Sequence, residues 1–135
     1  MLLPLFCAII REEVIFLITR DDAIEVCLRF EDSFEDYPFK DPNWTIMRHK
    51  SNNKMFAAIY EHLGKIWINL KAEPMTGDFW KNVFPAVVPA YHMNKEHWIS
   101  VILDGTMSDE EIIPLIEDSF LLTMPKKNKT MQQNR

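Results

Sequence analysis

The stretch KIWINLK at residues 65–71 decides the fold class, because its apolar and polar side chains alternate without a break. Ile66, Ile68 and Leu70 fall on one side of an extended chain, since successive side chains of a β-strand point to opposite faces. The other side carries Lys65, Trp67, Asn69 and Lys71. We therefore predict a strand over residues 65–71 with one face in the core and a second face that meets a partner.

Similar patterns predict further strands and helices on both sides of this stretch. Strands are expected over residues 44–50, 54–60, 86–91 and 98–104. Helices are expected over residues 20–33, 76–84 and 109–122, and two of them follow capping-box sequences that start at Thr19 and Ser108. The order α-β-β-β-α-β-β-α predicts an α+β fold, a two-layer sandwich with helices on one face of a mostly antiparallel five-stranded sheet. The other face is expected to be at least partly open.

Length and composition indicate one globular domain of 135 residues. The apolar N-terminal stretch lacks the basic region of a signal peptide, so residues 1–18 are interpreted as an apolar extension. Residues 19–123 are expected to form the domain, and residues 124–135 a basic, disordered tail. The two cysteines form no C-x-x-C motif, which fits a reducing compartment, and we predict a cytoplasmic protein without membrane contact.

The second face of the predicted sheet combines tryptophan with basic residues. Aromatic rings can stack on nucleobases, and the neighbouring bases can contact phosphates. The predicted partner-binding residues are Arg48, Lys65, Trp67, Lys71, His92, Asn94, Lys95, His97 and Trp98. Three structural explanations compete with this one: a Trp67–Trp98 pair that only stabilises the sheet, coverage by residues 1–18, and burial in a homodimer.

Signals for catalysis and for metal binding are weak. His92 and His97 supply two ligands next to Glu96, whereas a zinc site needs three or four protein ligands. The sequence has no P-loop and no G-x-S-x-G motif. We therefore predict no enzyme activity, no catalytic residue, no metal site and no cofactor. Residues 21–41 include eight acidic residues and two basic ones. A cation-binding ridge on the first helix is therefore an alternative function.

Five blocks of the sequence resemble the MmcQ/YjbR family. They are DYPF at 36–39, KMFA at 54–57, INLKAEP at 68–74, PAYHMNKEHWISVILDG at 89–105 and EEIIPLIEDSFLL at 110–122. The similarity spans residues 19–123, with Ala72 in a position where many members have cysteine. Any role assigned to that cysteine is absent from this chain.

This resemblance implies a CyaY-like fold, grouped with frataxin-like and secretion-chaperone-like proteins, and a bacterial DNA-binding protein with a double-wing motif. It carries over no catalytic residue. DNA is accordingly the predicted ligand of a non-enzymatic binding domain. The alternatives are a protein partner or a second copy of the chain, and frataxin-like cation binding on the acidic first helix.

Overall fold

The computed structural model describes residues 17–126. Helix α2 (Arg20–Leu28) is followed by strands β1 (Ser33–Asp36), β2 (Thr45–His49), β3 (Met55–His62) and β4 (Lys65–Lys71). Helix α3 (Pro74–Val83), strands β5 (Val87–Pro89) and β6 (Trp98–Leu103) and helix α4 (Asp109–Leu122) complete the order. The strands form one sheet in the order β1-β2-β3-β4-β6-β5, and all neighbouring strands are antiparallel.

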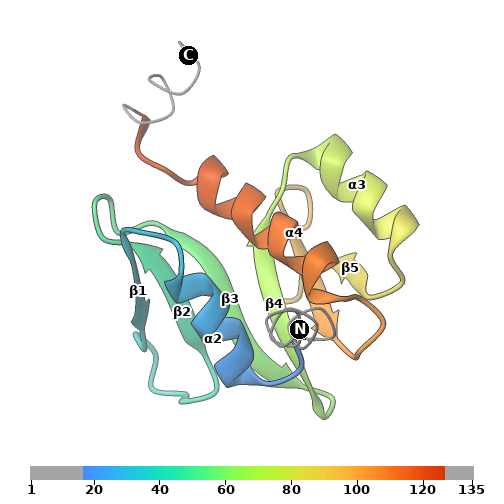
Figure 1. The fold of residues 1–135 in the computed structure, drawn as a ribbon, viewed down its shortest axis with the longest axis horizontal. Coiled ribbons are helices and arrows are strands. Elements are labelled where there is room, and N and C mark those ends of the chain that lie inside the picture. Colours follow the sequence, from blue (N-terminus) through green and yellow to red (C-terminus); the bar gives the residue numbers. More distant parts are fainter. Residues whose placement is uncertain (1–16, 127–135) are drawn as a thin grey trace, which may run out of the picture.

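Helices α2 and α4 cover the same face of this sheet, α2 over the β1–β3 side and α4 across β3 and β4 (Figure 1). Helix α3 lies beside α4, next to β5. The core fills the space between helices and sheet, and its fully buried members include Ala23, Cys27, Ile59, Ile68, Leu70, Val101 and Ile116. The predicted α+β sandwich with helices on one face is therefore confirmed.

The sheet has six strands, whereas five were predicted. The first helix ends at Leu28, before the predicted end at residue 33, and Asp32 then turns the chain with a φ of 73°. The Ser33 hydroxyl lies 3.0 Å from the carbonyl oxygen of Cys27 and 2.6 Å from that of Phe30, and donates to them. Because the last carbonyls of a helix have no partner within it, this contact favours the helix end. Ser33–Asp36 then pair with β2 as an extra edge strand.

Local sequence signals account well for the other elements. Both capping boxes form, with Thr19 paired to Asp22 and Ser108 paired to Glu111. Strand β4 has the predicted bounds, and α4 occupies the predicted residues 109–122. Leu63 and Gly64 connect β3 to β4 with φ values of 54° and 80°, the pair of positive angles that a tight I′ hairpin turn needs.

Ser119 links α4 to the sheet through a buried hydroxyl. Its Oγ donates to the Phe56 carbonyl oxygen at 2.6 Å and accepts from the Lys71 backbone N–H at 2.9 Å. Phe56 belongs to β3 and Lys71 to β4. One side chain therefore satisfies a backbone acceptor on one strand and a backbone donor on the next, both under the helix.

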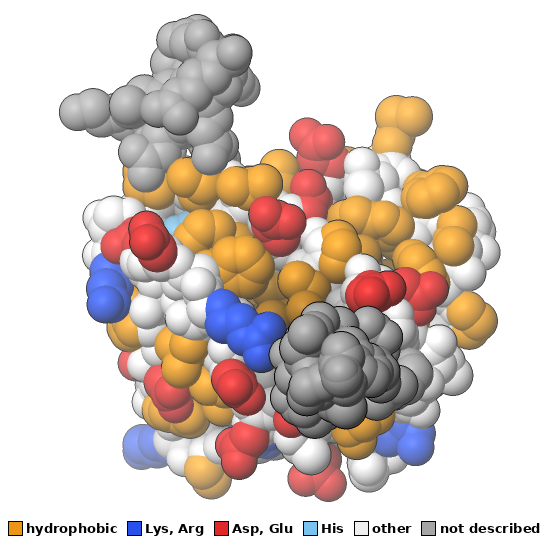
Figure 2. Space-filling model, viewed as in Figure 1, with side chains coloured by type: hydrophobic (Ala, Val, Ile, Leu, Met, Phe, Trp, Pro, Cys, Tyr) orange, Lys and Arg blue, Asp and Glu red, His pale blue; other side chains and the backbone are white. Residues whose placement is uncertain are grey.

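Apolar side chains are also found on the outer surface of the helical layer. Figure 2 shows them over the part of the molecule where α3 and α4 lie. On α3, the exposed Met75, Phe79 and Val83 are spaced four residues apart and so share one side of the helix. No helix within residues 17–126 is long and apolar enough to cross a membrane.

We expect Ser119→Ala to lower the free energy of unfolding by about 1–3 kcal/mol, because two buried backbone groups lose their partner. Urea unfolding followed by circular dichroism measures this change. Ser51→Ala is the control, since among residues 17–126 its exposed hydroxyl bonds only the side chain of Asp32. For this variant we expect a change in the free energy of unfolding within about 0.5 kcal/mol. Equal effects of the two substitutions would contradict the linking role of Ser119.

Candidate ligand-binding face

The sheet face that points away from α2 and α4 is called the rear face. One row of side chains across β2, β3, β4 and β6 consists of Ile46, Ala58, Asn69 and Ser100. The next row consists of Tyr60, Trp67 and Ile102. Because strand residues alternate between faces, these rows lie opposite the core residues Ile68 and Leu70. Trp67 thus lies on the face where the sequence pattern placed it.

Two connections of the chain cover the middle of the rear face, so this part of it is closed. Trp44, just before β2, stacks on Tyr60 with ring centroids 4.3 Å apart. In the connection between β5 and β6, the backbone N–H of Tyr91 donates to Ser100 Oγ at 3.0 Å. The Tyr91 carbonyl oxygen accepts from Asn69 Nδ2 at 2.8 Å. Asn69 and Ser100 are fully buried as a result.

A closed polar network lies under these connections. Asn69 Oδ1 accepts from the hydroxyls of Tyr60 and Ser100 at 2.8 and 2.5 Å. Burial raises the pKa of Tyr60 to about 12, because the phenolate would have to form away from water. Each polar side-chain atom of the network has at least one hydrogen-bond partner, either in another member or in the Tyr91 backbone. The network therefore attaches the β5–β6 connection to the sheet in a defined position.

An aromatic cluster extends this packing along the rear face. His62 stacks on Tyr91 at 4.1 Å and meets Trp67 edge-on at 4.8 Å. Trp67 also lies 6.2 Å from Tyr60, measured between ring centroids. Its indole N–H is buried and has no hydrogen-bond partner among residues 17–126. The ring of Trp67 therefore packs mainly on aromatic residues of its own chain.

A pocket of about 380 Å³ lies on the rear face between the two connections. This volume falls within the range of about 300–1,000 Å³ that is typical of small-molecule sites. Strands β2 and β3 provide the floor, and the connections provide the walls. At the edge of the pocket His92 has a φ of 62°. The lining residues are Phe39, Asp41, Trp44, Ile46, Met55, Ala58, His92 and Met93.

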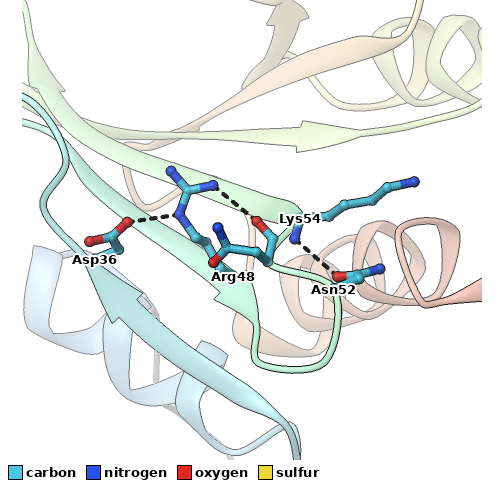
Figure 3. A network of polar contacts seen from close by, with 5 residues as sticks. Asp36, Arg48, Asn52 and Lys54 are labelled. Atoms are coloured by element: carbon cyan, nitrogen blue, oxygen red, sulfur yellow. Dashed lines mark hydrogen bonds and ion pairs between the residues drawn. The ribbon is translucent and has the colours of Figure 1, made fainter.

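Arg48 lies on β2, two residues from the pocket floor at Ile46, but its charge is already paired. Figure 3 shows its guanidinium between Asp36 and the turn that precedes β3. Nε is 2.8 Å from Asp36 Oδ2, and Nη1 donates to the Asn53 carbonyl oxygen at 3.1 Å. The carboxylate of Asp36 offsets the cation, so Arg48 presents less net positive charge to a phosphate than its sequence position suggested.

The other basic and aromatic residues predicted to bind a partner are spread over the rear face. Lys65 and Lys71 stand at the two ends of β4, about 20 Å apart at the usual rise of a strand. Lys71 is the cross-strand neighbour of Trp98, and its Nζ lies 5.9 Å from the centre of that ring. Trp67 instead faces Ile102, so the alternative of a Trp67–Trp98 pair is wrong.

The connection between β5 and β6 holds the remaining predicted residues. Asn94 shapes it, because its Oδ1 accepts from the backbone N–H groups of Glu96 and His97 at 2.8 and 3.1 Å. Lys95 and His97 are exposed, and His97 Nε2 lies 4.0 Å from the Glu96 carboxylate. Asn94 thus has a structural role in the turn, whereas Lys95 and His97 are accessible to a partner.

The alternative of a cation ridge on the first helix meets a different arrangement. Asp22 forms the capping box with Thr19, and Glu25 lies 4.0 Å from Arg29 on the same helix. Within residues 17–126, no group of three His, Cys, Asp or Glu side chains is placed to hold a metal ion. Residues 1–18 form the extension that could cover the rear face. Of these, residues 1–16 lie outside the described part of the chain. Leu17 is buried with the core on the helical side.

A family model described as YjbR matches residues 28–122. The chain belongs to the YjbR family. The matched range runs from the end of α2 to the end of α4 and includes every residue that lines the pocket. The rear-face pocket is therefore built entirely within the YjbR domain.

Relatives of known sequence and structure agree with this assignment. The uncharacterized protein YyaQ of Bacillus subtilis is 39% identical over 118 residues, which cover 79% of this chain and 99% of YyaQ. The uncharacterized protein YbdF of Escherichia coli O157:H7 is 32% identical over 101 residues, covering 75% of this chain and 73% of YbdF. The crystal structure of Deinococcus radiodurans DR2400, with domain DUF419, has a TM-score of 0.72 at 32% identity and covers 82% and 81% of the two chains. A Pseudomonas syringae crystal structure has a TM-score of 0.71 at 35% identity, covering 78% and 99%.

Several pocket residues were missing from the predicted partner-binding set. They are Phe39, Asp41, Trp44, Ile46, Met55, Ala58 and Met93. One signal was available, because the segments DYPFKDPNW and AYHMN concentrate aromatic residues at the ends of predicted strands and in the connections next to them. Their approach to one another on the sheet depends on contacts between distant parts of the chain, which periodicity cannot show.

We expect the wild type to lose more stability at high pH than Tyr60→Phe does. An ordinary tyrosine has a pKa of about 10, and folding raises that of Tyr60 to about 12. The neutral phenol thus stabilises the fold fully below pH 10, and this contribution is lost as the pH rises toward 12. Between pH 8 and pH 11.5 the wild type should lose about 2 kcal/mol more than the variant. Urea unfolding at both pH values tests this, and equal losses would contradict the burial of the phenol.

Proposed function

We propose that this YjbR-family chain is a non-enzymatic binding domain that takes an apolar or aromatic group of its ligand into the rear-face pocket. The observation that carries the proposal is the pocket itself, an apolar hollow between two connections. The buried polar network fixes one of its walls. Transfer of an apolar group from water into such a pocket is favourable, at about 25 cal/mol per Å² of buried surface.

The nature of the lining supports binding. The titratable side chains among the lining residues are Asp41 and His92, and both are exposed at the rim. The buried hydroxyls nearby, those of Tyr60 and Ser100, donate to Asn69 and are held in a structural network. Met55 on β3 and Met93 in the β5–β6 connection add flexible side chains to the lining, and thioether side chains adapt to ligands of different shape.

We expect neutral indole to bind in the pocket, because its flat ring can pack between the aromatic walls. A ¹H–¹⁵N NMR titration should shift the backbone amides of Ile46, Ala58 and Met93. Phe39→Ala should weaken binding about three- to tenfold, in line with an aromatic contact worth about 0.5–1.5 kcal/mol. Phe79→Ala is the matched control, because Phe39 and Phe79 are similarly exposed, at 57% and 61%, and Phe79 lies on α3. Shifts confined to other parts of the sheet would contradict the proposal.

DNA is a second candidate ligand, and the Lys71–Trp98 corner favours it. There an ammonium group lies over a half-buried indole, and the exposed Lys95 and His97 follow in the adjacent connection. Single strands bind to such combinations by stacking and by charge. A formal net charge of −5 and the pairing of Arg48 with Asp36 work against a polyanion.

We expect DNA binding at this corner, if it operates, to weaken as salt is added. Fluorescence anisotropy with labelled single-stranded and duplex DNA at 50 and 200 mM NaCl provides the measurement. Lys71→Gln should then reduce the affinity and its salt dependence. Lys81→Gln should leave both unchanged, because Lys81 lies on α3 and pairs with Asp78. Absence of binding at 50 mM NaCl would remove DNA as a ligand.

A further inference from the structure

We infer that the rear-face pocket selects ligands in which an organic ammonium group is attached to an apolar body. This inference rests on the proposed function, since it names the chemical class that the same pocket takes. It depends on one acidic residue, Asp41, in a mostly apolar lining and on the aromatic rings around it. Lysine-like side chains, aromatic amines and methylated amines belong to this class.

The carboxylate of Asp41 is the anionic group in the pocket lining. Its Oδ1 accepts from the backbone N–H of Asn43 at 2.9 Å, which orients the carboxylate within the connection. In the part of the chain that the structure describes, the Lys and Arg ion pairs involve Glu25, Asp36 and Asp78, and none involves Asp41. An incoming cation would therefore find a negative charge that is positioned but not neutralised by a close ion pair.

Aromatic rings line the pocket next to this charge. Trp44 and Phe39 come from the same connection as Asp41, and His92 stands opposite, with its ring centroid 6.2 Å from that of Trp44. Trp44 is held in place by stacking on Tyr60. The faces of tryptophan and phenylalanine rings attract cations, by about 0.5–1 kcal/mol at exposed sites. The aromatic rings and the carboxylate thus both favour a positively charged ligand.

The surroundings of the pocket favour this sign as well. The nearest guanidinium along β2, that of Arg48, is paired with Asp36, which reduces the positive charge that an anionic ligand would meet there. The chain as a whole has a formal net charge of −5. A ligand carboxylate would be repelled by the like charge of Asp41. An ammonium group would be attracted both by Asp41 and by the aromatic rings. The apolar floor at Ile46 and Ala58 accepts the uncharged part of either ligand equally.

Three indole ligands of similar size separate the effect of charge from the effect of the ring. Tryptamine carries an ammonium group, indole is neutral, and indole-3-propionate carries a carboxylate. At pH 7 and low salt we expect tryptamine to bind roughly five- to tenfold more tightly than indole, and indole-3-propionate to bind most weakly. Dissociation constants come from ¹H–¹⁵N NMR titrations that follow the amides of Ile46, Ala58 and Met93.

Asp41→Asn tests the role of the carboxylate, because the amide oxygen can still accept from the Asn43 N–H. In this variant the preference for tryptamine over indole should fall to roughly two- to threefold, the part that the aromatic rings alone supply. Glu117→Gln is the matched control, since Glu117 is an exposed residue on α4 and its substitution makes the same change in net charge. This variant should keep the wild-type preference for tryptamine over indole. Equal affinities for tryptamine and indole in the wild type, or an undiminished preference for tryptamine in Asp41→Asn, would overturn the ammonium inference while indole binding still supports the pocket. If none of the three ligands shifts the pocket amides, both the inference and the proposed function are overturned.

Discussion

The burial of Asn69 is the constraint on which the rear face depends. Its side chain accepts two hydroxyl hydrogen bonds and donates one to the Tyr91 carbonyl, so both polar atoms of a buried amide in the central strand have protein partners. An amide buried without partners would cost several kcal/mol. The connection between β5 and β6 therefore has to lie over β4, and this position brings Tyr91 and His92 to the aromatic residues of β3 and of the connection before β2.

The pocket is a consequence of that arrangement. Its floor is a pair of small or medium apolar residues on neighbouring strands, and its walls are two connections that approach one another over the sheet. The helical layer packs on the opposite face and contributes none of the lining residues. The helices thus cover one face of the antiparallel sheet, and the pocket lies on the other. Membership of the YjbR family agrees with this fold.

The alternation in KIWINLK correctly separated core-facing from rear-facing residues, and the two capping boxes correctly marked helix starts. The prediction failed where the first helix was extended to residue 33 and no strand was expected after it, because the helix ends at Leu28 and residues 33–36 form β1. It also treated the whole second face of β4 as accessible. Asn69 is buried because Tyr91, distant in sequence, bonds to it. Arg48 is less available because Asp36 is its partner on a strand that was not predicted. The wrong expectations for Asn69 and for Arg48 both result from contacts between residues more than ten positions apart.

The sequence by itself determined the class of fold, most of the helices and strands, the family resemblance and the side of the sheet on which Trp67 lies. These properties follow from the 2-residue and 3.6-residue periods and from capping, which act between near neighbours in the chain. Only the tertiary structure decided which rear-face residues are reachable and that Phe39, Asp41, Trp44, His92 and Met93 share a pocket. The physical reason is that the position of a connection is set by the buried polar groups it satisfies and the rings it packs on, and these lie on other strands.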